Sequence, residues 1–157
     1  MPEPSQPSAR PVDTKRDSAS GGGGRDVLVV EDSAIAAKFL SRRLMHFGYR
    51  VHVASDGSAA IAMVAHQPFA LAFIDVALGP PGSIDGLRVC QAIKQSAGLA
   101  RDAGTRVVMA TGLGGESDRV RGSLAGCDAY LVKPLLEADF VKTLRALDPA
   151  FSWPEGD

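Results

Sequence analysis

The sequence has few of the features that mark secreted, membrane or zinc-binding proteins. It contains two cysteines, Cys90 and Cys127, whose spacing fits no metal site, so we expect reduced, half-buried thiols. No apolar run approaches the roughly 20 residues that span a bilayer. The N-terminus lacks the basic-then-apolar pattern of a signal peptide. We therefore expect a cytoplasmic protein without a membrane segment.

An excess of charge of one sign is also absent. The chain has 17 basic and 18 acidic residues, which gives a net charge of −1 at pH 7. Domains that bind nucleic acid usually carry a basic patch, so we expect no nucleic-acid partner. With 157 residues and 45% hydrophobic content, the chain is long enough for one domain with a core.

Composition divides the chain into three parts. Residues 1–24 are rich in proline, serine and charge and end in four glycines, which indicates a disordered tail and a flexible linker. The glycines precede the first apolar run and no Gly-Lys-Ser/Thr follows them, which excludes a phosphate-binding loop. Residues 25–148 are expected to form the folded domain, and residues 149–157 a short C-terminal tail.

Apolar runs and helical patterns alternate through the folded domain. The expected strands are residues 26–30, 50–54, 70–74, 106–110 and 128–132. The expected helices span about 33–47, 57–66, 85–97, 116–125 and 136–147. This alternation predicts an α/β fold in which helices cover both faces of a parallel sheet. For five such units we expect the flavodoxin-like, doubly wound strand order 2-1-3-4-5, which is known from other folds of this kind.

Three acids stand at the ends of two predicted central strands. Glu31 and Asp32 follow strand 26–30, and Asp75 follows strand 70–74. In the order 2-1-3-4-5 a ligand crevice lies outside the carboxyl ends of the first and third strands, so these carboxylates should converge. Converging carboxylates repel one another unless a cation binds, and oxygen ligands at short reach favour Mg²⁺. A carboxylate beside Mg²⁺ can attack phosphorus and become an aspartyl phosphate.

Two other strands also end in polar residues, Thr111 and Lys133. The transition state of phosphoryl transfer carries negative charge on its equatorial oxygens. The Lys133 ammonium and the Thr111 hydroxyl are groups that stabilise such charge. Both residues are therefore candidates for binding the phosphoryl group.

Four motifs together resemble the receiver domain of two-component response regulators (CheY-like proteins). They are Val29-Val30-Glu31-Asp32-Ser33, Phe73-Ile74-Asp75, Ala110-Thr111-Gly112 and Tyr130-Leu131-Val132-Lys133-Pro134. Each motif alone is weak, but the four occur in the family's order and spacing over about residues 25–148.

The resemblance implies a metal site around the phosphoacceptor. Asp75 would be the phosphoacceptor. Glu31, Asp32 and Asp75, with the backbone carbonyl of Ala77, would bind Mg²⁺.

The resemblance also implies a phosphorylation switch. Thr111 would bind the phosphoryl group, Lys133 would pair with Asp75 or its phosphate, and Tyr130 would swing inward on activation. The peptide bond between Lys133 and Pro134 would be cis.

Further implications concern partners. The phosphoryl group would come from a histidine kinase or a histidine phosphotransfer protein. The switched surface, formed by helix 116–125, strand 128–132 and helix 136–147, would bind a downstream protein. The protein would be a monomer or a phosphorylation-dependent dimer. It would be no enzyme beyond catalysing its own phosphorylation and dephosphorylation.

Two departures from the family pattern leave alternatives open. The loop after Asp75 is about three residues longer than usual and carries Pro80-Pro81 within residues 79–84. No effector domain follows residue 148, so a stand-alone receiver is expected. The alternatives are a phosphorelay shuttle with no output of its own and an interaction module that works without phosphorylation. Ala77 argues against a phosphatase of the haloacid dehalogenase type, because such enzymes need a second aspartate at that position.

Overall fold

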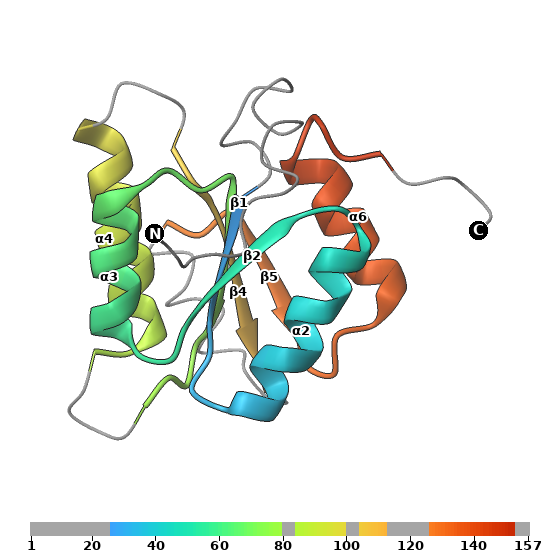
Figure 1. Ribbon diagram of the computed structural model, residues 1–157, viewed down its shortest axis with the longest axis horizontal. Coiled ribbons are helices and arrows are strands. Elements are labelled where there is room, and N and C mark those ends of the chain that lie inside the picture. The colour runs from blue at the N-terminus through green and yellow to red at the C-terminus, as the bar shows by residue number, and fades with distance from the viewer. Residues whose placement is uncertain (1–25, 80–83, 100–103, 113–125, 153–157) are drawn as a thin grey trace, which may run out of the picture.

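A five-stranded parallel sheet forms the centre of the molecule (Figure 1). The computed structural model describes residues 26–79, 84–99, 104–112 and 126–152. The strands are β1 (Asp26–Val30), β2 (Arg50–Ala54), β3 (Leu71–Asp75), β4 (Arg106–Thr111) and β5 (Ala129–Val132). Their order is β2-β1-β3-β4-β5 and all neighbouring pairs are parallel. The predicted fold class and strand order are confirmed.

Helices of the described residues cover both faces of the sheet (Figure 1). The helices are α2 (Ala34–His46), α3 (Gly57–His66), α4 (Gly86–Leu99) and α6 (Glu137–Leu147). Helices α3 and α4 lie on one face, and α2 and α6 lie on the other. The predicted helix over 116–125, the predicted tail over 1–24 and residues 80–83 of the long loop lie outside the described residues.

Side chains alternate along each central strand and so build two separate cores. Leu28 and Val30 of β1 belong to the core beneath α3 and α4, whereas Val27 and Val29 belong to the core beneath α2 and α6. All four side chains are fully buried. Residues 27–30 face one core or the other, which is why this part of β1 reads as a continuous apolar run.

Short polar side chains fix where two helices begin. The Ser33 hydroxyl accepts the backbone N–H of Ala36 at 3.2 Å at the start of α2. The Asp56 carboxylate accepts the N–H of Ala59 at 2.8 Å at the start of α3. Each cap satisfies a backbone donor that has no partner inside the helix.

Strand β3 is placed one residue later than predicted. It was expected over 70–74, but it ends at Asp75, which is the register partner of Ala110. The N–H of Val76 then donates to the Ala110 carbonyl at 2.9 Å, so the sheet's pairing continues past the acidic residue. Similarly, β4 includes Thr111, which is the register partner of Val132. Asp75 and Thr111 are therefore held within the sheet itself.

The cysteines are reduced, but Cys90 is more buried than expected. Both thiols are free; Cys127 is half-buried, and Cys90 is fully buried. Burial raises the pKa of the Cys90 thiol to about 12, so it remains protonated at neutral pH. Among the helices of the described segments, none combines the length and the apolar character needed to cross a lipid bilayer.

Candidate functional site

The carboxyl ends of β1 and β3 bring the three predicted acids together. Val30 and Ile74 are register partners, so the residues that follow them, Glu31 and Asp75, lie at the same level of the sheet. One carboxylate oxygen from each of Glu31, Asp32 and Asp75 lies within 4.8 Å of the others. Residues up to 44 positions apart in sequence, from Glu31 to Asp75, thus form one acidic cluster because their strands are neighbours.

Backbone N–H groups orient the three carboxylates. Glu31 Oε2 accepts the N–H of Ser33 at 3.2 Å, and Asp75 Oδ1 accepts the N–H of Ala77 at 3.1 Å. The exposed Asp32 accepts the N–H of Gly79 at 3.1 Å, so the start of the long loop is hydrogen-bonded to the acidic cluster. These bonds leave other carboxylate lone pairs to face a ligand.

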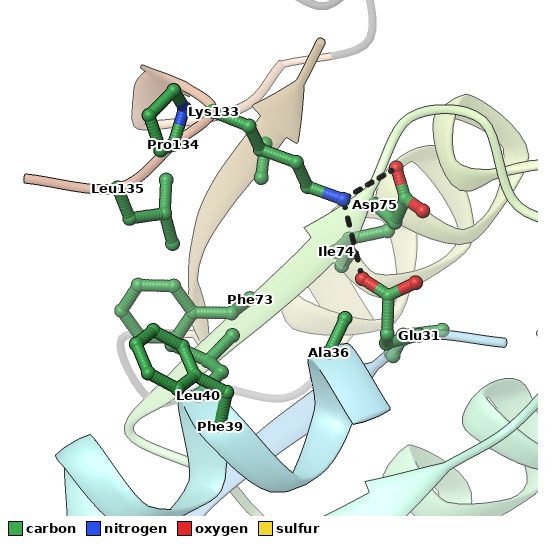
Figure 2. Close-up of a pocket in the computed structure, with 12 residues that line it drawn as sticks. Glu31, Ala36, Phe39, Leu40, Phe73, Ile74, Asp75, Lys133, Pro134 and Leu135 are labelled. Atoms are coloured by element: carbon green, nitrogen blue, oxygen red, sulfur yellow. Dashed lines mark hydrogen bonds and ion pairs between the residues drawn. The ribbon is translucent and has the colours of Figure 1, made fainter. Parts of the chain in front are cut away.

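Lys133 brings a positive charge to two of the acids. Its Nζ lies 3.3 Å from Glu31 Oε1 and 3.5 Å from Asp75 Oδ1, and Figure 2 shows the side chain extending from the end of β5 toward both carboxylates. Both acids are more than nine-tenths buried, whereas about a third of the Lys133 side chain is exposed. One ammonium therefore serves two buried carboxylates.

The electrostatics of Glu31 show that this single ammonium does not neutralise the site. Burial, followed by the negative charge of Asp75, raises the pKa of Glu31 above its ordinary value of 4.5. Lys133 and the N–H of Ser33 act in the opposite direction, without cancelling the rise. The site has an excess of negative charge, which favours a bound cation.

Thr111 lies beside Asp75 in the sheet. Asp75 pairs in register with Ala110, and Thr111 is the next residue of β4, at 3% exposure. The Thr111 carbonyl accepts the N–H of Lys133 at 2.7 Å, which joins the end of β4 to the loop that carries the lysine. The structure therefore places the predicted hydroxyl and the predicted ammonium on adjoining strand ends.

The other predicted residues lie farther along these elements. The peptide bond between Lys133 and Pro134 is cis. Tyr130 is half-buried against the core beneath α3 and α4. Ala77 is exposed directly after the acidic cluster. Of the predicted switch surface, β5 and α6 are described, whereas the helix expected over 116–125 lies outside the described residues.

Gly86 is a residue of the site that sequence reasoning did not identify. A Cβ placed on Gly86 would lie 2.1 Å from the backbone oxygen of Asp75 and 3.0 Å from the Cα of Val76. Any side chain at this position would therefore displace the backbone of the acidic cluster. The signal in the sequence is the pair Asp85-Gly86, where Asp85 caps α4 by accepting the N–H of Arg88 at 3.0 Å.

A largely apolar pocket of about 300 Å³ adjoins the acidic cluster. Figure 2 shows Phe39 and Leu40 of α2, Phe73 of β3 and Leu135 of the following loop around it. Glu31, Asp75 and Lys133 also line it. The charged groups thus stand at the rim of an apolar wall, where interactions between charges are less screened than in bulk water.

The donor set of the cluster determines which ion it suits. It contains carboxylate oxygens and, among the described residues, no histidine or cysteine. Such a set suits a hard, oxygen-seeking divalent cation that keeps part of its water shell. The cluster is a candidate cation site placed beside a candidate nucleophile, Asp75.

Comparison with known protein families agrees with this geometry. Residues 27–145 match the family described as response regulator receiver domain. Among curated proteins, a probable transcriptional regulator, ycf27, of Guillardia theta is 33% identical over 121 residues, which cover 77% of this chain and 44% of the relative. The transcriptional regulatory protein TcrA of Mycobacterium tuberculosis is 36% identical over 124 residues, which cover 79% and 46%. The chain spans about half the length of the curated relatives it matches.

Solved structures include similar folds. The chemotaxis protein CheY4 of Vibrio cholerae is 27% identical with a TM-score of 0.66, covering 78% of this chain and 97% of that chain. A response regulator from Burkholderia pseudomallei, solved with a phosphorylated aspartic acid, a calcium ion and citrate, is 26% identical with a TM-score of 0.63. That match covers 79% of this chain and 66% of the other.

Proposed function

This chain belongs to the response regulator receiver domain family, and we propose that it accepts a phosphoryl group on Asp75 in a Mg²⁺-dependent reaction and thereby switches a protein-binding surface. We assign this role to the unit over residues 25–148. The observation that carries the proposal is the cluster of three carboxylates within 4.8 Å, two of which share the ammonium of Lys133.

The phosphoryl transfer begins at Asp75. A carboxylate oxygen of Asp75 attacks the phosphorus of a phosphohistidine on a kinase or a phosphotransfer protein. The new bond joins this oxygen to phosphorus, the phosphorus–nitrogen bond breaks, and its electron pair stays on the imidazole of the donor. The N–H of Ala77 and the ammonium of Lys133 orient the attacking carboxylate, because both contact Asp75 Oδ1.

The cation would be held by Glu31, Asp32 and Asp75, with the Ala77 carbonyl as a further oxygen ligand. When bound, Mg²⁺ supplies positive charge that offsets the charge building on the phosphoryl oxygens. The raised pKa of Glu31 supports a divalent ion here, because it reports uncompensated negative charge. A phosphorylated aspartate and a calcium ion in the Burkholderia relative support the same chemistry in this chain.

The remaining residues would convert phosphorylation into a change of surface. Lys133 exchanges its contact with carboxylates for one with the phosphoryl group, and the Thr111 hydroxyl donates to another phosphoryl oxygen. The half-buried Tyr130 changes its packing as Thr111 moves. The surface so altered includes β5, α6 and the segment over 116–125, and its partner would be a downstream protein.

The test is phosphorylation by phosphoramidate or acetyl phosphate with Mg²⁺, followed by intact mass measurement. We expect one added phosphoryl group on the wild type. The variant Asp75→Asn and the wild type treated with EDTA should show none. The matched control is Asp85→Asn, because Asp85 is a nearby carboxylate that caps α4 and an asparagine caps equally well.

Two results would refute the proposed phosphorylation. One is a wild type that gains no phosphoryl group under conditions in which the protein is folded. The other is equal labelling of the wild type and Asp75→Asn, which would place the modification on another residue.

A further inference from the structure

Arg43 joins helix α2 to the loop that carries Lys133. Its Nη1 donates a hydrogen bond to the backbone oxygen of Leu135 at 3.3 Å. Leu135 lies two residues after Lys133 in the β5–α6 loop, which we define as residues 133–136. A side chain from one helix therefore contacts the backbone that presents the site's ammonium.

The guanidinium of Arg43 is fixed by its surroundings. Its Cζ lies 5.0 Å from the ring centroid of the fully buried Phe140 and 5.8 Å from that of Phe39. Its Nη2 lies 4.0 Å from Glu137 Oε1 at the start of α6, and its side chain is 20% exposed. A planar guanidinium stacked on aromatic rings loses few further rotamers when it donates a hydrogen bond. Arg43 can thus act as a rigid donor to Leu135.

The β5–α6 loop is fixed on both sides of this contact. Before it, the N–H of Lys133 donates to the Thr111 carbonyl at 2.7 Å. After it, the N–H of Phe140 donates to the Leu136 carbonyl at 3.0 Å in the first turn of α6. Between these two points the loop runs along the surface, and Arg43 supplies a side-chain hydrogen bond to it.

The position of this backbone matters because it sets the point from which the Lys133 side chain extends toward the two acids. Its Nζ lies 3.3 Å from Glu31 Oε1 and 3.5 Å from Asp75 Oδ1. Its four-carbon stem is flexible, so the starting point of the stem determines how often the ammonium reaches both carboxylates. A shift of about 1 Å in a catalytic group can change a rate by about a hundredfold.

We propose that Arg43 is a positioning residue: it fixes the Leu135 backbone and thereby places Lys133 over Glu31 and Asp75. The inference rests on the proposed phosphorylation where rates are concerned, but the placement of Lys133 can be measured without it. The hydrogen bond and the ion pair of Arg43 go to Leu135 and Glu137, and not to the three acids of the cluster.

Chemical labelling measures the placement directly. Lysine amines are labelled with trace amounts of an acylating reagent, and the extent at Lys133 is compared with that at the exposed Lys142 by peptide mass mapping. The test variant is Arg43→Met, which keeps an apolar stem against Phe140 but removes the donor. The matched control is Arg42→Met, because Arg42 is the exposed neighbour on the same helix.

We expect Lys133 in Arg43→Met to be labelled about threefold more than in the wild type, relative to Lys142, because a looser ammonium is more accessible. Arg42→Met should match the wild type. Unchanged labelling of Lys133 in Arg43→Met, or an equal rise in Arg42→Met, overturns the proposal. If Arg43→Met does not fold by circular dichroism, Arg43→Leu, which also lacks the donor, is labelled instead and judged by the same outcomes.

The rate of phosphorylation tests whether Arg43 acts on the reaction by positioning Lys133. With phosphoramidate and saturating Mg²⁺, Arg43→Met should be about tenfold slower than the wild type. In a Lys133→Ala background, adding Arg43→Met should slow the reaction no further, because the group that Arg43 positions is gone. Independent, multiplicative losses would overturn this role, since they indicate a merely structural effect. A wild type that is not phosphorylated refutes the proposed function and leaves the labelling result to decide on Arg43.

Discussion

A carboxylate is buried at each end of strand β1, and the neighbouring charges shift the pKa values of the two groups in opposite directions. Asp26 begins the strand and Glu31 follows it, and each is 7% exposed. Burial by itself raises the pKa of both groups. The difference between them therefore lies in the charges that the fold places nearby.

Asp26 is fully paired by the neighbouring strand. Arg50 donates to both of its oxygens at 2.9 Å, and His52 Nε2 lies 3.0 Å from Oδ1. Burial raises the pKa of Asp26, but the hydrogen bonds from Arg50 and His52 more than offset it and hold the pKa below its ordinary value of 3.8. The His52 ring also packs edge-on against Phe69 at 5.3 Å. This end of the strand is built for stability.

Glu31 lies next to a second acid, Asp75, whereas Asp26 lies next to the basic side chains of Arg50 and His52. Asp75 crowds it, Lys133 is shared between the two, and the pKa of Glu31 stays raised. Such an arrangement destabilises the folded protein at neutral pH unless a cation binds. Incomplete neutralisation of charge, and not burial of charge alone, therefore distinguishes the candidate site from the other end of β1.

The largest effect is expected from Gly86→Ala. This substitution tests whether the Asp75 backbone, at the end of the sheet that carries the acidic cluster, can move to accommodate a side chain. The added methyl group would meet the Asp75 backbone oxygen, so the free energy of unfolding should fall by about 3 kcal/mol. Urea denaturation measures this loss. The matched control is Gly112→Ala, where a Cβ meets nothing within 4 Å and a change below about 1 kcal/mol is expected. Equal effects of the two substitutions would contradict the packing of Gly86 under Asp75.

A smaller loss is expected from Asp26→Asn, which breaks the paired end of β1. Removing the charge from Arg50 and His52 should lower the free energy of unfolding by about 2 kcal/mol at pH 7. Because the pKa of Asp26 is lowered in the folded state, its contribution is present above the ordinary value of 3.8 and is lost as the pH falls through the folded pKa. The wild type and the variant should therefore converge in acid.

The control for Asp26→Asn is Asp56→Asn, because Asp56 caps α3 and asparagine caps as well. The control should leave the stability within about 0.5 kcal/mol at every pH. A loss for Asp26→Asn that persists unchanged in acid would show that its charge is not what stabilises this end.

The smallest effect, and of opposite sign, is expected from Glu31→Gln. Without Mg²⁺ at pH 7 it should raise the free energy of unfolding by about 1 kcal/mol, because it removes an uncompensated buried charge. The pKa of Glu31 is raised in the folded state, so the destabilisation is absent below the ordinary value of 4.5 and appears as the pH rises through the folded pKa. The gain should thus vanish in acid.

Urea denaturation with EDTA and then with Mg²⁺ checks the behaviour of Glu31. Added Mg²⁺ should stabilise the wild type more than Glu31→Gln, since a ligand that binds the folded state shifts the unfolding equilibrium. The exposed Glu137 serves as control through Glu137→Gln, with little expected change. A loss of stability for Glu31→Gln at pH 7 without Mg²⁺ would show that the charge of Glu31 stabilises the fold, as the charge of Asp26 does, and would contradict the proposed difference between the two ends of β1.

Much of the fold was predictable because it follows from local patterns. The apolar runs within β1 and β3 predicted central strands, and both strands lie inside the sheet. Glu31, Asp32 and Asp75 were expected to converge once the strand order was assumed, and the structure brings them together. Their roles as metal ligands and phosphoacceptor remain predictions.

Other contacts left no readable signal, because they depend on distances between residues far apart in sequence. Arg50 and His52 read as ordinary edge-strand residues until the register places them beside Asp26. Arg43 reads as one of two exposed arginines on a helix, and only packing brings it against Phe140 and Leu135. Gly86 reads as a glycine beside the cap Asp85 at the start of the expected helix over 85–97, and only the structure shows that it packs against the Asp75 backbone.

Hydrophobic periodicity and turn chemistry act locally, so the amino-acid sequence is enough to predict the alternation of strands and helices and the polar residues at the strand ends. Which charges meet depends on the folded arrangement of the strands. It set Arg50 and His52 beside Asp26, and Asp75 beside Glu31. Charge interactions depend on separation and burial, and both are fixed only when the strands are in register and the helices are packed.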